Sequence, residues 1–154
     1  MFMVKVTIQI DDSAYKKVSE NLPQIKEKGL RYVGQEMLRN LSLNSPVDHG
    51  LLRQWFFFNT STDNIEIRSP AAYAIFVNDG TGIYNGGSII KPKSGKALAF
   101  KAGPKWNGPV NKDGYAFLKY SKGQKGQKFV EKSIKQTQEK LEQLFIKAIN
   151  EVLQ

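Results

Sequence analysis

The chain has 154 residues, of which 40% are hydrophobic, so its size suits one domain with a modest core. Cysteine is absent, which excludes disulfides and thiolate metal sites and fits a reducing compartment. No apolar run approaches the roughly 18 residues that a membrane span needs, and residues 1–10 lack the pattern of a signal peptide. We therefore expect a soluble, non-secreted protein with a single domain over residues 1–154.

The formal net charge of +9 lies in one segment of the chain. Residues 91–128 hold a single acid and ten lysines: Lys91, Lys93, Lys96, Lys101, Lys105, Lys112, Lys119, Lys122, Lys125 and Lys128. Such a patch attracts polyanions, although arginine is the residue preferred for bidentate recognition of bases. We predict that these lysines contact either DNA, without reading its sequence, or a partner protein. Trp106 among them can stack on a base. The alternative is a solvated loop that lysine keeps soluble.

Taken in chain order, the first half predicts strands around one long helix. Strict alternation over 2–10 predicts a half-buried strand. A short helix is expected over 14–20, and a long amphipathic helix over 22–43 begins with a proline in its first turn. Residues 52–60 and 65–68 then predict the two strands of a hairpin.

The second half predicts short elements and a second long helix. Residues 71–77 suit a short helix, and 84–88 an exposed loop tip. Short strands are expected over 97–100 and 115–120, and helical spacing runs from 130 to 152. The sequence thus predicts an α+β fold, in which a small antiparallel sheet packs against two long amphipathic helices. A flexible basic loop segment is expected within 84–128.

A predicted turn follows the first long helix, and several of its residues restrict the backbone. Pro46 cannot continue a helix and favours extended backbone at the residue before it, while Asp48 and Gly50 favour a turn. We expect Pro46, Asp48, Gly50 and Arg53 to hold the junction between helix and sheet. Arg53 is expected either to pair with Asp48 or Asp79 or to be solvated.

The aromatic run that follows predicts an apolar sheet. Alternation places Trp55 and Phe57 on one face of the strand and Phe56 and Phe58 on the other. A sheet with two apolar faces is covered on both. We therefore expect a helix on one face and another subunit on the other.

Candidate catalytic and metal-binding residues are few. His49 is the only histidine, and its neighbours match a catalytic triad in composition only, because adjacent residues on a tight turn rarely reach the required geometry. Residues 79–82 (Asp-Gly-Thr-Gly) lack the Lys-Ser/Thr ending of a phosphate-binding loop, so we interpret them as a structural turn. We expect no catalytic, cofactor-binding or metal-ligating residue, and hence a protein that is not an enzyme.

Four segments in this order resemble one family. Residues 45–53 (Ser-Pro-Val-Asp-His-Gly-Leu-Leu-Arg) are similar to an Ala/Ser-Pro-Val-Asp-Thr-Gly pattern followed by Leu and Arg, and 73–81 (Tyr-Ala-Ile-Phe-Val-Asn-Asp-Gly-Thr) to Tyr-Ala-x-x-Val-Glu-x-Gly-Thr. Residues 90–100 and 126–130 follow in the expected places. Together they resemble the neck or tail-component proteins of long-tailed bacteriophages, the lambdoid head–tail joining family. This chain departs from the pattern with His for Thr in the first segment and Asn for Glu in the second.

The resemblance covers roughly residues 22–153 and implies a structural function. It implies a non-enzymatic virion assembly protein, a head–tail connector (neck) or tail-completion subunit in a ring through which DNA passes. Asp79, Gly80 and Thr81 would shape the family turn, and no cofactor is implied. The partners would be copies of the chain, the portal or adaptor and the tail proteins, in the virion and, during assembly, in the host cytoplasm. The alternatives are a tail-tube terminator and a non-specific DNA-binding module.

Overall fold

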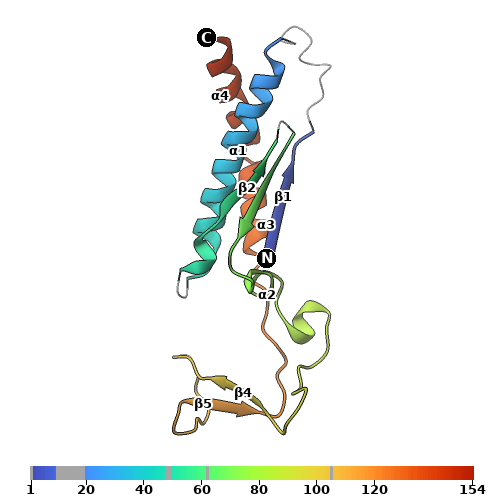
Figure 1. Cartoon of the computed structure of the whole chain (residues 1–154), viewed down its shortest axis with the longest axis vertical. Coiled ribbons are helices and arrows are strands. Elements are labelled where there is room, and N and C mark those ends of the chain that lie inside the picture. Colours follow the sequence, from blue (N-terminus) through green and yellow to red (C-terminus); the bar gives the residue numbers. More distant parts are fainter. Residues whose placement is uncertain (1, 10–19, 48–49, 62, 105) are drawn as a thin grey trace. The chain divides into compact units, whose positions relative to one another are not determined.

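The computed structural model describes residues 2–9, 20–47, 50–61, 63–104 and 106–154 (Figure 1). The chain forms two compact units, one of residues 1–78 together with 128–154 and one of residues 79–127. The second unit contains nearly all of the range in which the sequence predicts a flexible basic loop, and it has two strands of its own. Most of the short helix expected over 14–20 lies outside the described residues.

The first unit contains a three-stranded antiparallel sheet. Its strands are β1 (Phe2–Thr7), β2 (Phe56–Thr60) and β3 (Asn64–Ser69), in the order β1-β3-β2. In the central strand, Ile65 and Ile67 are buried, while Glu66 between them points to the opposite face. The pairing of β2 with β3 is interrupted by a bulge between Phe57 and Asn59.

The strand expected over 52–60 begins later than predicted. Residues Leu51–Arg53 form a 3-10 turn, η2, in which Arg53 N–H donates to the Gly50 carbonyl at 3.1 Å. Gly50, the N-cap residue of this turn, has a φ of +80°, which only glycine adopts without strain. The strand therefore starts only at Phe56.

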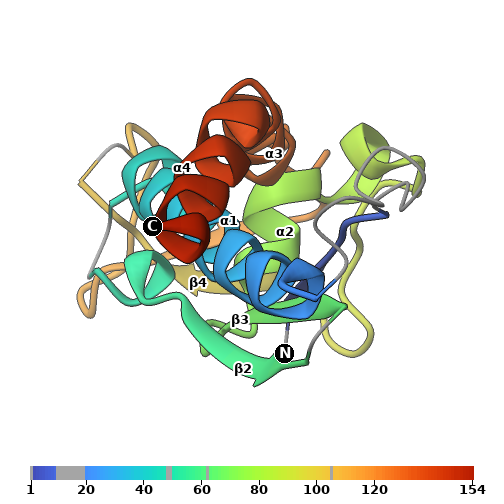
Figure 2. The same cartoon turned by 90° about the horizontal axis from the view of Figure 1, so that it is seen from above.

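Helix α1 (Leu22–Asn44) lies between the sheet and the C-terminal helices (Figure 2). Two glycines allow the close approach on its two sides. A Cβ on Gly29 would overlap the ring of Phe145 in the last helix, α4 (Leu141–Leu153), and a Cβ on Gly34 would overlap the ring of Phe57 in β2. The first unit is therefore built in layers, with α1 between the sheet and the helical pair.

The C-terminal helix is two helices, α3 (Phe129–Gln138) and α4 (Leu141–Leu153), rather than the single helix that the spacing predicts. At the interruption, Lys140 N–H donates to the Thr137 carbonyl, three residues back, at 3.1 Å. The buried Thr137 hydroxyl donates to the Ser133 carbonyl and accepts from the Asn40 amide of α1. The buried Thr137 therefore joins the end of α3 to α1 just before the interruption.

The second unit is reached through helix α2 (Ala74–Asp79), which confirms the predicted short helix with a shift along the chain. Its elements are the 3-10 turn η3 (Gly82–Asn85) and a hairpin of β4 (Leu98–Lys101) and β5 (Tyr115–Leu118). With helices packed on antiparallel strands, the chain has the predicted α+β fold.

Candidate interaction surfaces

The corner after α1 is held by a buried serine. Ser45 ends the helix with extended backbone, as the following Pro46 predicts. Its hydroxyl donates to the Leu41 carbonyl at 2.6 Å and accepts from the indole Nε1 of Trp55 at 3.1 Å. The Trp55 ring in turn packs edge-on against Phe129 of α3. One side chain thus joins the end of α1 to the start of the sheet and to the core.

The other residues predicted at this corner differ in how far the structure describes them. Gly50 has the positive φ that the turn requires. Arg53 is exposed and has no ion-pair partner within the part of the chain that the structure describes, and its predicted pairing with Asp48 falls outside that part. Asp48, and with it the single histidine, lies outside the described residues.

Asn78 joins α2 to α3 across 52 positions of the sequence. Its side chain is buried, and its Oδ1 accepts from the backbone N–H of Val130 at 2.9 Å. The backbone carbonyl of Asn78 also accepts from the N–H of Lys128 at 3.0 Å. The amide therefore caps the amino end of α3 from a distant segment. The sequence marked this position only as a departure from the family pattern.

The predicted turn at 79–81 makes backbone contacts inside the second unit. Gly80 has a φ of +88°, and a Cβ there would lie 2.7 Å from the Gln124 carbonyl oxygen. Thr81 N–H donates to the same carbonyl at 2.9 Å, and the Thr81 hydroxyl accepts from Gln124 N–H at 3.0 Å. Gly80 and Thr81 therefore pair the segment after α2 with the segment around Gln124, which supports their interpretation as a structural turn.

The second unit is strongly basic and buries little. Its sequence carries nine lysines and two acids, Asp79 and Asp113. Among its described residues only Gly80 and Ala116 are buried, and the described lysines are exposed: Lys91, Lys93, Lys96, Lys101, Lys112, Lys119, Lys122 and Lys125. Lys105 lies outside the described residues. Lys128 belongs to the first unit, where it is the N-cap residue of α3 and pairs with Glu131 at 3.3 Å.

One face of the β4–β5 hairpin combines cations with aromatic rings. Phe117 of β5 is 56% exposed, and Tyr115 lies opposite Lys101 of β4. Trp106, which the sequence singles out for stacking, is half-buried, and its ring packs edge-on with Phe100 at 5.1 Å between centroids. The rings of the hairpin face are therefore more exposed than that of Trp106, whose predicted stacking stays a prediction.

The outer face of the three-stranded sheet is also apolar in part. Met3, Arg68 and Phe56 lie side by side across the three strands, and the Arg68 guanidinium lies 3.1 Å from the centroid of the Phe58 ring. Phe56, Phe57 and Phe58 are 41%, 37% and 52% exposed, and the Phe57 ring also lies against Gly34 of α1. We call Met3, Phe56, Phe58 and Arg68 the sheet patch.

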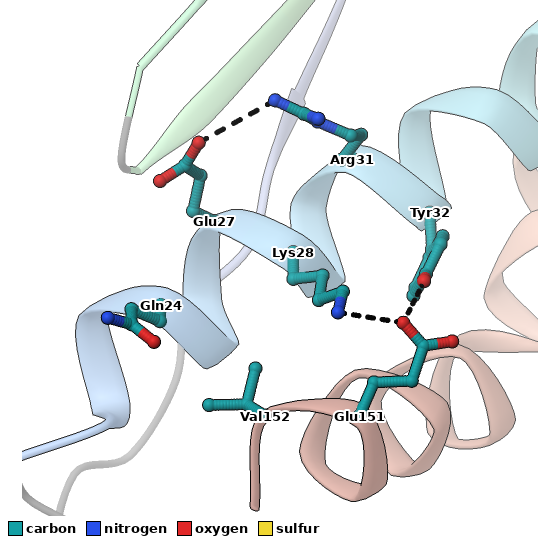
Figure 3. A pocket seen from close by; sticks show the side chains of 7 residues that line it. All are labelled: Gln24, Glu27, Lys28, Arg31, Tyr32, Glu151 and Val152. Atoms are coloured by element: carbon teal, nitrogen blue, oxygen red, sulfur yellow. Dashed lines mark hydrogen bonds and ion pairs between the residues drawn. The ribbon is translucent and has the colours of Figure 1, made fainter. Parts of the chain in front are cut away.

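A cleft of about 540 Å³ lies between α1 and the end of α4 (Figure 3). Glu151 accepts from the Tyr32 hydroxyl and lies 2.8 Å from Lys28 Nζ. The hydrogen bond from Lys28, and then that from Tyr32, lowers the pKa of the Glu151 carboxyl. These polar groups pair with one another and so join α4 to α1. Lys28 and Tyr32 are four residues apart and share one helix face, but no local sequence signal marks the acid that meets them.

Within the described ranges, no group of three or more acidic or histidine side chains is placed to hold a metal ion. None of the helices in those ranges is long and apolar enough to cross a membrane. Comparisons with protein-family models, curated proteins and solved structures gave no match to this chain.

Proposed function

We propose that this chain is a non-enzymatic assembly protein of a phage or prophage virion. In this proposal it is a head–tail connector (neck) or tail-completion subunit and acts in a ring through which DNA passes. Its partners are further copies of the chain, the portal or adaptor and the tail proteins. Its place is the neck or tail junction of the virion, and the host cytoplasm during assembly.

One observation carries the proposal: the segments that resemble the family pattern form joints of the fold. Ser45, in the first segment, joins α1 to the sheet through Trp55. Asn78, in the second, caps α3, and Thr81 pairs with Gln124. The contacts of these segments set the shape of the fold, and this supports a role in assembly rather than in a reaction.

The exposed surfaces support an assembly protein as well. Large apolar side chains are exposed on both units, including Phe58 at 52% and Phe117 at 56%. Side chains of this kind mark surfaces that bind other proteins. The basic second unit adds a field that tolerates any DNA sequence, as a DNA conduit requires.

Removal of the gene from the phage or prophage that carries it tests the proposal. We expect DNA-filled heads and tails that remain separate in electron micrographs, with infectious particles restored by the wild-type chain. Tails of abnormal length would favour the tail-tube terminator instead. Normal, infectious particles without the chain would refute the whole proposal.

The exposed lysines of the second unit favour one further candidate, a non-specific DNA-binding module. The affinity for duplex DNA would then fall with salt, with a slope of about −0.9 per phosphate contact. Replacing Lys101 and Lys119 by Gln should make the slope shallower by about 1.8 if both contact phosphates. The matched control is Lys5→Gln in the first unit. Binding that is undetectable at physiological salt would exclude this candidate.

A further inference from the structure

One face of the β4–β5 hairpin presents two aromatic rings. Strands β4 and β5 lie side by side (Figure 1), with Lys101 opposite Tyr115 and Ala99 opposite Phe117, so these four side chains share one face. We call these four residues the hairpin face. Tyr115 is 41% and Phe117 56% exposed, and the residue opposite Phe117 is a small alanine. The two rings therefore occupy consecutive positions on the exposed face of one strand.

The other face of the hairpin is covered in part by its own unit. Phe100 and Ala116 alternate with the hairpin face and lie opposite each other. Ala116 is buried, and the Trp106 ring packs edge-on with Phe100 at 5.1 Å between centroids. The hairpin thus has one face that packs inside the unit and one that the described residues leave exposed.

The charge around the hairpin face is positive. Lys101 lies on the face, and Lys119 lies two positions beyond Phe117; both lysines are exposed, and neither forms an ion pair with another described residue. The acid nearest to the hairpin in the sequence is Asp113, in the exposed loop before β5. Since residues 79–127 hold nine lysines and two acids, the surface is complementary in charge to a polyanion.

The spacing of the two rings favours a single-stranded polyanion over a duplex. Tyr115 and Phe117 are two residues apart on an antiparallel strand, which separates their Cα atoms by about 6.8 Å at about 3.4 Å per residue. Successive bases of a duplex strand are only about 3.4 Å apart and stack on one another, so they offer no free base face to either ring. A single strand can unstack its bases and place one on each ring.

We propose that the hairpin face binds single-stranded nucleic acid. In this contact one base stacks on Phe117 and the next on Tyr115, while Lys101 and Lys119 contact the phosphates beside them. Stacking of this kind tolerates any base, because every base has a π-face. The inference goes beyond the proposed assembly role and does not depend on it. It differs from the duplex-binding candidate both in the ligand and in the rings that hold it.

Fluorescence anisotropy of the full chain tests the choice of ligand. The probes are labelled oligo-dT, oligo-U and a duplex, each about 12 nucleotides or base pairs long, which is within the usual site size. The affinities are compared after extrapolation to about 1 M salt, where counterion release no longer contributes. We expect at least one single strand to bind about 5-fold or more tightly than the duplex there, the value for one stacked base. A preference for oligo-dT or oligo-U identifies DNA or RNA as the source of the strand.

Two substitutions separate stacking from charge. Phe117→Thr removes one ring, retains a strand-forming residue, and should weaken single-strand binding about 5- to 150-fold without changing its salt slope. Lys101→Gln should instead make the slope shallower by about 0.7. The matched controls are Lys5→Gln and Phe58→Thr, because Phe58 is 52% exposed beside Arg68 in the sheet patch of the first unit. Circular dichroism and thermal unfolding establish that each variant folds.

Three results would overturn the proposal. The first is a duplex that binds as tightly as both single strands at the extrapolated salt concentration. The second is a loss for folded Phe117→Thr no larger than that for Phe58→Thr. The third is poly-glutamate that displaces the single strands equally well at matched charge, which would identify an acidic protein surface as the partner. None of these results affects the gene-removal test of the proposed function.

Discussion

Replacing Asn78 by Ala tests whether α3 depends on a cap supplied by a distant segment. The substitution removes the Oδ1 that accepts from Val130 N–H at 2.9 Å. Asn78 is only 2% exposed, so water cannot readily replace the lost acceptor. The amino end of α3 would then retain an unsatisfied buried donor.

Two estimates of the energy of this hydrogen bond give the expected loss of stability. Loss of a helix cap costs about 0.5–2 kcal/mol, and a buried donor without a partner costs about 1–3 kcal/mol. Because these figures describe one contact, they are not added, and we expect the free energy of unfolding to fall by about 2 kcal/mol. For a chain of this length, that corresponds to a decrease in Tm of about 4–8 °C.

Urea unfolding followed by circular dichroism measures the effect. Asn150→Ala is the matched control, because Asn150 is exposed on α4, and it should change the free energy by less than about 0.5 kcal/mol. Asn78→Asp retains an acceptor at the amino end of the helix and should lose less than Asn78→Ala. A decrease for Asn78→Ala no larger than that of the control would refute the capping role.

Three further substitutions address the layers and the corner. Gly34→Ala should lower Tm despite the better helix propensity of Ala, because overpacking against the aromatic ring costs about 1–3 kcal/mol. Ser45→Ala should cost about 1–3 kcal/mol in urea unfolding, since Trp55 Nε1 loses its acceptor. The bond from Lys140 lowers the pKa of Glu36, so this carboxylate stabilises the fold above its ordinary pKa and loses that effect as the pH falls through the lowered value. Glu36→Gln should cost about 0.5 kcal/mol at neutral pH and make stability less dependent on pH in the acid range; an unchanged acid dependence would contradict this.

The sequence predicted the elements that local signals delimit. The bounds predicted for the long helix, 22–43, differ from those of α1 by one residue at the carboxyl end. The agreement is close because a proline lies in the first turn of the helix and Ser45-Pro46 follows its last turn. The hairpin partner expected over 65–68 is β3, whose alternation is strict. Alternation also predicts the exposed Phe56, although it does not predict the bulge between Phe57 and Asn59.

Features that depend on distant residues were outside the reach of local patterns. The C-terminal helix breaks where Thr137 bonds to Asn40, which is 97 positions away. The cap on α3 comes from Asn78, and the acid that meets Lys28 comes from the far end of the chain. Local periodicity contains no information on these pairs, since each forms only when the layers assemble.

The hydrogen bond from Lys128 N–H to the Asn78 carbonyl means that the second unit leaves and re-enters the first at a single point. Residues 79–127 are thus a closed insertion, topologically equivalent to a surface loop. Closing a loop of that length costs about 3 kcal/mol of chain entropy, and the cost changes slowly with length. Such an insertion can be shortened, lengthened or exchanged for another sequence while the layers of the first unit retain their contacts. Its residues are therefore free to diverge independently of the scaffold that carries them.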